Sequence, residues 1–218
     1  MTNWEKEQGY LNAHGISTID IPTDVFQWVK TNSFKAKENK NPYNHELVGH
    51  MKEEYDLFKE NPPKSVFRFI TQQALQGPFF RDTLCKVSVL THDVPIVVDS
   101  LWVNFQKKYE FNPIHNHSGF ASFIIFVNIP YDLKKEEDYF KVIHHGSSKH
   151  TSKLSFLNYL PHDGTINPTP VDVDKSFEGK MLMFSNKHLH TVYPFYTSDD
   201  YRITISGNLK FDTSGLQA

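Results

Sequence analysis

From about residue 84 onward, the sequence is built from short segments rich in β-branched and aromatic residues, separated by clusters of Pro, Gly, Asn and Asp. The strands that this pattern predicts span residues 86–90, 98–106, 122–128, 154–160, 180–184 and 202–211. Short strands without long helices between them favour a β-sandwich or a jelly-roll barrel. Eighteen Phe and ten Tyr residues can form the core, because each buried aromatic ring removes a large apolar area from water.

The first part of the chain, up to about residue 76, has a mixed pattern. It predicts a short strand and three helical segments, over residues 17–21, 24–29, 44–60 and 66–75. Within the third of these segments apolar residues recur near helical spacing, at Leu47, Met51, Tyr55 and Phe58. The charged run 134–138 is expected to be a solvated loop. We expect a helical part, about residues 1–80, to pack on a β core, about residues 84–211, in one domain of 218 residues.

The charge balance and the cysteine content exclude several classes of protein. With 23 basic and 25 acidic residues the formal charge is -2, which gives no electrostatic reason to expect nucleic acid or an anionic membrane as partner. The single cysteine, Cys85, excludes an internal disulfide and suits a reducing compartment. No stretch approaches the roughly 18 consecutive apolar residues of a membrane span, and the polar N-terminus does not resemble a secretory signal. We therefore expect a cytoplasmic protein that binds neither nucleic acid nor a membrane.

Two His-x-His pairs carry the strongest chemical signal. His115 and His117 lie two residues apart, so on a strand both imidazoles point to the same face and can reach one metal ion. His190 follows an apolar strand later in the chain, and a jelly roll can bring the two segments side by side. Imidazole nitrogens suit iron, zinc, copper and nickel. His188 forms the second pair with His190 and competes with His117 for the third ligand position, although a surface role is the stronger expectation for it.

Arg202 is the third signal, because it opens an alternating strand that would enter an apolar barrel. A buried guanidinium needs an anionic partner, since an unpaired buried charge is costly. A carboxylate ligand can accept two parallel hydrogen bonds from it. A structural salt bridge would satisfy the same residue, so the sequence leaves both interpretations open.

The motifs occur in a characteristic order. They are Trp102-Val-Asn104, Asn112-Pro113-x-His115-x-His117-x-Gly119, Ser122-x-x-x-Phe126-x-x-x-Pro130, Gly179 with Phe184, His190-x-Val192-x-Pro194 and Arg202-x-x-x-Ser206-x-Asn208. This order resembles the family of 2-oxoglutarate/Fe(II)-dependent oxygenases with bacterial, marine and phage members. The resemblance covers roughly residues 98–210. It implies a mainly β fold, a double-stranded β-helix of jelly-roll, cupin-like type with N-terminal helices packed on it, and Fe(II), 2-oxoglutarate and dioxygen as reactants. If a phage encodes the chain, the expected location is the host cytoplasm.

The resemblance also implies roles for single residues. It assigns His115, His117 and His190 to the metal and Arg202 to the co-substrate 2-oxoglutarate. Family members often carry tyrosines at two positions that are Ile125 and Phe126 in this chain. We expect Asn104 and Ser122 to make those contacts instead, and Ser206 completes the expected set of co-substrate contacts.

One departure concerns the metal ligands. The wider superfamily uses two histidines and one carboxylate, whereas this chain has His117 at the carboxylate position. Three neutral ligands leave the iron site one negative charge short, and no residue nearby in the sequence supplies a carboxylate. Some cupins nevertheless support oxygen chemistry at a three-histidine iron site.

The expected function is a dioxygenase that couples decarboxylation of 2-oxoglutarate to hydroxylation of a peptidyl side chain or a small metabolite. One alternative is a three-histidine cupin dioxygenase that does not use 2-oxoglutarate. Another is a non-catalytic jelly-roll module with a structural metal ion. A fourth protein ligand such as His188 would favour the non-catalytic module, because structural sites are closed whereas catalytic sites keep positions open. Arg202 argues against both alternatives, since neither requires a buried cation there.

Overall fold

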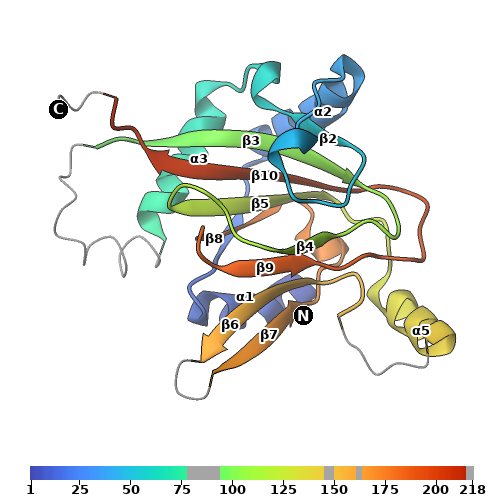
Figure 1. Cartoon of the computed structure of the whole chain (residues 1–218). Coiled ribbons are helices and arrows are strands. Elements are labelled where there is room, and N and C mark those ends of the chain that lie inside the picture. The colour runs from blue at the N-terminus through green and yellow to red at the C-terminus, as the bar shows by residue number, and fades with distance from the viewer. Residues whose placement is uncertain (78–93, 145–149, 161–163, 215–218) are drawn as a thin grey trace.

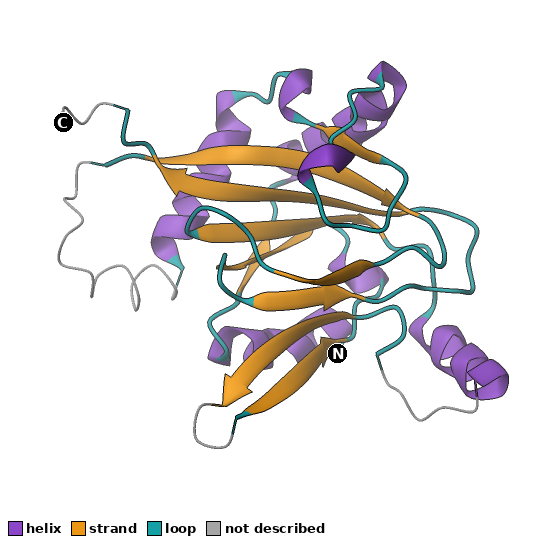
Figure 2. Cartoon of the chain, viewed as in Figure 1, coloured by secondary structure: helices purple, strands orange, loops and turns teal. Residues whose placement is uncertain are grey.

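The computed structural model describes residues 1–77, 94–144, 150–160 and 164–214. These residues form two antiparallel sheets with helices around them, as Figures 1 and 2 show. The large sheet has the strand order β1 (Ser17–Asp20), β8 (Lys180–Ser185), β5 (Ala121–Asn128), β10 (Arg202–Phe211), β3 (Ile96–Gln106) and β2 (Glu54–Asp56). The small sheet has the order β4 (Asn112–His115), β9 (Leu189–Val192), β6 (Leu154–Leu160) and β7 (Thr165–Val171). This pair of sheets is a double-stranded β-helix, so the expected fold is confirmed.

The helices lie mainly on the large sheet and at the ends of the small one (Figure 1). The α-helices are α1 (Asn3–Ala13), α2 (Thr23–Asn39), α3 (Lys64–Gln76) and α5 (Leu133–His144). Short 3-10 helices are η1 (Asn44–Glu46), η2 (Phe58–Glu60) and η4 (Lys175–Phe177). No helix among the described residues is long and apolar enough to cross a membrane.

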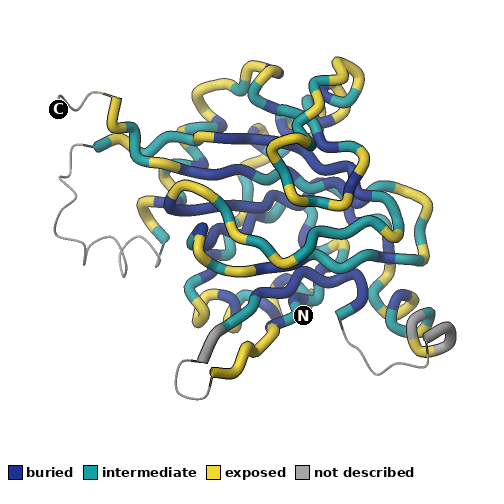
Figure 3. Tube along the Cα trace, in the orientation of Figure 1, coloured by how far each residue is buried: buried dark blue, intermediate teal, exposed yellow. Residues whose placement is uncertain are grey.

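The large sheet is covered on both faces, which explains the unbroken apolar run of β5. Phe123 and Ile125 point to the core shared with α2 and α3, whereas Ile124 and Phe126 point to the core between the two sheets. A strand buried on both faces does not alternate apolar and polar residues. In Figure 3 the strands at the centre of this sheet are accordingly buried along most of their length.

Most of the predicted strands are confirmed. The predicted ends of β1, β3, β5, β6, β8 and β10 all agree with the observed ends to within two residues. The helix predicted over 66–75 is α3, and the helical turn predicted over 24–29 is the beginning of the longer α2. The strand expected over 86–90, together with Cys85, lies outside the described residues. The sequence analysis did not predict α1 or β7.

The helix predicted over 44–60 is wrong. This segment contains η1, β2 and η2, because its backbone pairs with the open edge of the large sheet. Tyr55 lies opposite Val103 in that pairing, and its ring packs on Phe105 with 6.0 Å between centroids. The near-helical spacing of apolar residues therefore did not predict the secondary structure of this segment, because its backbone hydrogen-bonds to a strand elsewhere in the chain.

The solvated loop predicted over 134–138 is also wrong, since these residues belong to α5. Glu136 is fully buried on this helix and accepts hydrogen bonds from the backbone N–H groups of Tyr196 and Thr197, at 2.9 and 2.8 Å. The sequence alone does not distinguish this buried carboxylate from a solvated one, because its hydrogen-bond donors lie 60 residues downstream.

Candidate metal centre and its pocket

Three histidines converge where the two neighbouring strands β4 and β9 meet. His115 and His190 are direct partners across this antiparallel pair. The ligand nitrogens of His115, His117 and His190 all lie within 4.8 Å of one another, and the Nε2 atoms of His117 and His190 are 3.3 Å apart. The structure therefore brings together the three histidines predicted as ligands. The expectation that His115 and His117 share a strand is wrong, because β4 ends at His115 and His117 lies two residues beyond it in the loop that leads to β5.

Backbone carbonyls orient two of the three rings. Nδ1 of His115 lies 2.7 Å from the carbonyl oxygen of Pro113, and Nδ1 of His190 lies 2.9 Å from that of His188. A carbonyl only accepts, so each ring carries its proton on Nδ1 and keeps the lone pair on Nε2. This arrangement is the one that metal-binding histidines use, because the second hydrogen bond fixes tautomer and ring orientation.

The position of His117 is fixed by hydrogen bonds between its backbone and Asn186, in the loop between β8 and β9. The buried Asn186 accepts from the backbone N–H of His117 at 3.0 Å and donates from its side chain to the carbonyl oxygen of His117 at 3.2 Å. Two residues later Gly119 has φ +82°, and a Cβ there would lie 2.2 Å from the carbonyl oxygen of Leu209. Only glycine fits this turn between His117 and β5.

Burial keeps the three imidazoles neutral. It lowers the pKa of His117 to about 4 and holds the pKa of His190 well below its usual value, and the neighbouring histidines add to both effects. Burial also lowers the pKa of His115. At neutral pH the cluster therefore offers three lone pairs and no competing protons. This donor set fits a divalent transition metal such as Fe(II).

His188 lies outside the cluster. Among the described residues the only group of three or more metal-ligating side chains that includes these histidines is His115, His117 and His190. His188 contributes its backbone carbonyl, which orients His190. A three-ligand face without a fourth protein ligand leaves positions open for exchangeable groups.

A pocket between the two sheets contains this cluster and a band of polar residues from the large sheet. Trp102 packs beside His117, with 5.9 Å between ring centroids, and donates from its indole N–H to Oδ1 of Asn104 at 3.1 Å. The Asn104 amide in turn donates to the hydroxyls of Thr204 and Ser206 at 3.1 and 3.2 Å. Hydroxyls and an amide thus face the histidines across the pocket.

Arg202 also lines the pocket, and neutral groups surround it. Its side chain is 3% exposed, and all five N–H groups donate to protein acceptors. These are Gln106 Oε1, which accepts from Nε at 2.9 Å and Nη2 at 2.7 Å, the Tyr131 hydroxyl at 3.0 Å, and the carbonyls of Ser152 and Tyr193 at 2.6 and 2.9 Å. In the described part of the chain no carboxylate pairs with Arg202, so the salt bridge considered as an alternative is absent there.

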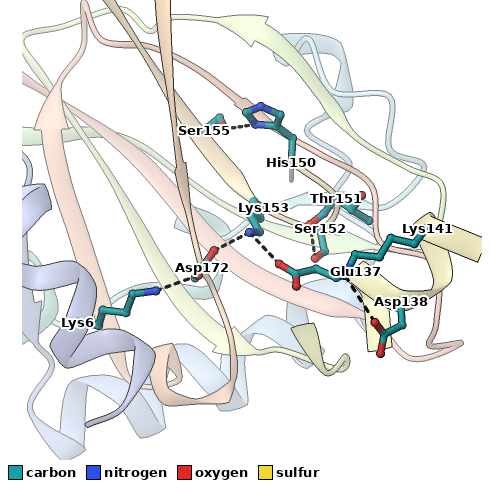
Figure 4. Close-up of polar contacts among 10 residues, drawn as sticks. All are labelled: Lys6, Glu137, Asp138, Lys141, His150, Thr151, Ser152, Lys153, Ser155 and Asp172. Atoms are coloured by element: carbon teal, nitrogen blue, oxygen red, sulfur yellow. Dashed lines mark hydrogen bonds and ion pairs between the residues drawn. The ribbon is translucent and has the colours of Figure 1, made fainter. Parts of the chain in front are cut away.

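Ion pairs that Figure 4 shows join the residue after Ser152 to α1 and α5; of their four charged side chains, that of Lys153 is buried and the others are partly or largely exposed. Ser152 is fully buried with φ +62°, a conformation that is strained for a residue with a side chain. The next residue, Lys153, pairs with Asp172 at 2.7 Å and with Glu137 at 3.3 Å, and Lys6 joins Asp172 at 3.3 Å. These ion pairs tie α1, α5 and the small sheet together around the acceptors of Arg202.

Ser122 is the expected site residue that the structure does not bring into the pocket. Its buried hydroxyl donates to Asn208 Oδ1 at 2.8 Å, and it is not among the residues that line the pocket. The sequence analysis in turn missed Thr204 and Gln106. Both follow a named residue by two positions on the same strand face, so the alternation rule could have found them.

Glu54 is a further residue that the sequence analysis missed. It lies on β2 opposite Asn104, lines the pocket, and is 1% exposed. One carboxylate oxygen accepts from the Asn44 side chain at 3.1 Å. Burial, assisted by the negative charge of Glu110, raises the pKa of Glu54 to about 7.

This pKa predicts a pH dependence of stability. Between the pKa of about 4.5 in the unfolded chain and about 7 in the folded protein, only the folded protein holds the proton, so raising the pH favours unfolding. The stabilisation is present below the lower pKa and is lost as the pH rises through the upper one, by about 3 kcal/mol in total. Glu54→Gln should remove this loss. Urea unfolding of the metal-free parent and variant between about pH 5 and pH 8 measures it.

The exposed Glu46 supplies the control, because Glu46→Gln removes the same formal charge from the same pocket. This control variant should keep the parental profile. Identical profiles for the parent and Glu54→Gln would contradict a buried, protonated Glu54.

Comparison with known proteins gives one family and a set of similar folds. A sequence model of the family described as "Putative 2OG-Fe(II) oxygenase" matches residues 100–208, a range that contains the three histidines and Arg202. No curated protein sequence matches the chain.

Three of the similar solved structures illustrate the fold. A prolyl-4-hydroxylase from Pseudomonas putida has 14% identity and a TM-score of 0.53, covering 95% of this chain and 98% of that one. AviO1 from Streptomyces viridochromogenes has 12% identity and a TM-score of 0.55, covering 97% of each chain. HygX from Streptomyces hygroscopicus, with nickel, 2-oxoglutarate and hygromycin B bound, has 10% identity and a TM-score of 0.51, covering 94% and 86%. At these identities the likeness is one of fold.

Proposed function

The chain belongs to the 2OG-Fe(II) oxygenase family whose model it matches, and on that premise we propose that His115, His117 and His190 hold Fe(II) and that Arg202 attracts 2-oxoglutarate. The protein is a 2-oxoglutarate- and Fe(II)-dependent dioxygenase on a double-stranded β-helix. The observation that supports the ligand assignment most strongly is the convergence of three neutral imidazoles in one pocket, two of them with Nδ1 committed to a backbone carbonyl.

Different side chains of this pocket are proposed to bind the metal and to exclude water. Bound Fe(II) and 2-oxoglutarate together supply the activation of dioxygen and the oxidation of a C–H bond. The three histidines keep their Nε2 lone pairs free for the metal, since burial disfavours their protonation. The apolar side chains of Ile124 and Phe126 line the same pocket and keep water from its floor.

Arg202 and the polar band are proposed to bind the co-substrate. Arg202 provides the only positive side-chain charge among the described residues that line the pocket, and it has no protein carboxylate as partner there. An entering carboxylate is attracted to this charge and can share the guanidinium donors with the neutral acceptors. The hydroxyls of Thr204 and Ser206 and the amide of Asn104 add further hydrogen-bonding groups on the same sheet face.

The two alternatives are less well supported. A cupin dioxygenase that does not use 2-oxoglutarate has no need for Arg202 in the pocket. A structural metal site would close its coordination with protein ligands, whereas His188 lies outside the cluster. The family match supports the oxygenase over both.

We propose hydroxylation of a peptidyl side chain or a small metabolite as the outcome. Among proteins of similar fold, one is named a prolyl-4-hydroxylase and another, HygX, has the small molecule hygromycin B bound. The fold therefore accommodates substrates of either kind. A single oxygenase domain and a cytoplasmic location are parts of the same proposal, supported by the packing of α2 and α3 on the large sheet and by a single cysteine.

The proposed function is tested by following 2-oxoglutarate in the presence of dioxygen without added substrate. Each turnover consumes one 2-oxoglutarate and one dioxygen and gives succinate and carbon dioxide in equal amounts, and added ascorbate supplies the two electrons and two protons that reduce the remaining oxygen atom to water. We expect formation of both to require Fe(II), and to be lost in His190→Ala, which removes a buried ligand. Succinate that forms equally well in His190→Ala would contradict the proposal.

A further inference from the structure

A segment that we call the strap, residues 44–54, crosses the pocket between the edges of the two sheets. At one end it enters β2 of the large sheet, and near its middle the backbone N–H of His50 donates to the carbonyl of Phe111, just before β4, at 2.8 Å. The Asn44 side chain closes the strap on itself by donating to the carbonyl of Met51 at 3.0 Å and to Glu54 at 3.1 Å. Several strap residues line the pocket, including Glu46 and Glu54.

Two hydrogen-bond acceptors meet where the strap touches the small sheet. Oδ1 of Asn112, on β4, is buried and has no hydrogen-bond partner among the described residues. A Cβ at Gly49 would lie 2.4 Å from this atom and 3.0 Å from Oε1 of Glu54, so both oxygens approach the same point of the strap. Asn112 and Glu54 both line the pocket. A buried acceptor without a donor is costly, which suggests that a ligand supplies the missing donor.

The charge balance of the pocket indicates what kind of donor this is. Among the described residues that line the pocket, the charged side chains are Glu46, Glu54 and Arg202. The charges of Fe(II) and the 2-oxoglutarate dianion cancel, and Arg202 faces an anion in the proposed function. In the described part of the chain no lysine or arginine pairs with Glu54, and its charged neighbour is Glu110. When Glu54 is ionised, the loaded pocket therefore retains an excess of negative charge beside an unsatisfied acceptor.

We propose that Glu54 and the side chain of Asn112 bind a primary ammonium or guanidinium group of the substrate, so that the enzyme acts on a cationic substrate. This inference rests on the proposed function, because it places the substrate in the same pocket as the metal. A cation bound there donates one charge-assisted hydrogen bond from an N–H to the Glu54 carboxylate and a second to Asn112 Oδ1. The raised pKa of Glu54 in the free protein agrees with a carboxylate that lacks its cation.

A purely structural role for Glu54 is the competing explanation, since the carboxylate also holds Asn44. Glu54→Gln separates the two roles. The amide oxygen of glutamine still accepts from Asn44, so the strap keeps its shape while the negative charge is lost. Glu46→Gln removes an equal charge from the exposed rim of the pocket and serves as the matched control.

The test measures binding of two probes to protein loaded with Fe(II) and 2-oxoglutarate under anaerobic conditions, by calorimetry. The probes are Nα-acetyl-lysine methylamide and Nα-acetyl-norleucine methylamide, which differ only in the terminal ammonium group. We expect the lysine probe to bind the parent more tightly than the norleucine probe. Glu54→Gln should weaken the lysine probe by at least about 30-fold, the cost of removing one partner of a buried charge pair, and leave the norleucine probe unchanged.

Three results would overturn the inference. They are equal or undetectable binding of the two probes by the parent, a preference for lysine that survives in Glu54→Gln, and an equal loss of preference in Glu46→Gln. The visible charge-transfer band of bound Fe(II) and 2-oxoglutarate is recorded in the same samples. If the band is present and the preference absent, this inference fails while the proposed function stands; if the band is absent, both fail.

Discussion

Replacing His117 with alanine should weaken Fe(II) binding by more than the roughly 10- to 100-fold that loss of an outer hydrogen-bond partner costs at a metal site. The variant removes one of three converging imidazoles. In the parent, Nε2 of His117 lies only 3.3 Å from Nε2 of His190. Anaerobic titration of the metal-free protein with Fe(II) against a competing chelator measures the change.

His188→Ala is the matched control, because His188 belongs to the other His-x-His pair but lies outside the cluster. Its contribution is a backbone carbonyl that alanine retains, so iron affinity should stay at the parental value. His117→Asp should also retain iron, since it restores the commoner set of two histidines and one carboxylate. If His188→Ala lost iron while His117→Ala kept it, the wrong histidine would have been assigned.

Replacing Arg202 with alanine should weaken 2-oxoglutarate binding by roughly 30- to several-thousand-fold while iron affinity stays the same. Truncating one member of a buried charge pair costs about 2–5 kcal/mol, and each factor of ten corresponds to about 1.4 kcal/mol. Arg202 is not part of the histidine cluster, so the metal should not sense its loss. Calorimetric titration of the Fe(II)-loaded variant with 2-oxoglutarate, without dioxygen, measures the first quantity, and anaerobic titration of the metal-free variant with Fe(II) against a competing chelator measures the second.

The surroundings of Arg202 predict a second effect of the same substitution. Gln106 Oε1 and the carbonyl of Tyr193 lose the guanidinium as donor, whereas the carbonyl of Ser152 keeps the Tyr131 hydroxyl as donor at 2.9 Å. Buried acceptors without donors destabilise the fold. Arg202→Lys keeps the charge with fewer donors, so it should recover part of the 2-oxoglutarate affinity. A folded Arg202→Ala protein that binds 2-oxoglutarate like the parent would exclude Arg202 from co-substrate binding.

The β core and the histidine cluster could be predicted because their signals are local. A spacing of two keeps His115 and His117 close together, although β4 ends at His115 and His117 lies two residues beyond it. The apolar run before His190 is β8, and His190 itself lies on the following strand, β9. The direct pairing of His115 with His190 could not be derived in this way, since it depends on a strand register set by the rest of the sheet.

The residues that the sequence analysis missed or misplaced depend on distant partners. Glu54 lies in a segment with helical spacing, and only its pairing with β3 brings it into the pocket. Ser122 shares β5 with pocket residues, yet its hydroxyl donates to Asn208, which lies directly opposite on the neighbouring strand β10. For Arg202 the sequence suggested either an anion or a salt bridge, whereas the described structure surrounds it with neutral dipoles. In each case the local sequence identifies the residue type, and the tertiary fold decides what it contacts.

Anaerobic titration of the metal-free parent with Fe(II), followed by 2-oxoglutarate, tests the central claim most directly. If the three histidines hold the iron and the co-substrate binds beside Arg202, a visible metal-to-ligand charge-transfer band appears when 2-oxoglutarate is added, and it saturates at one equivalent per chain. The band should be missing in His117→Ala and should require far more 2-oxoglutarate in Arg202→Ala. A tight iron complex of the parent that shows no band at any 2-oxoglutarate concentration would contradict the assignment and favour a three-histidine dioxygenase that does not use this co-substrate.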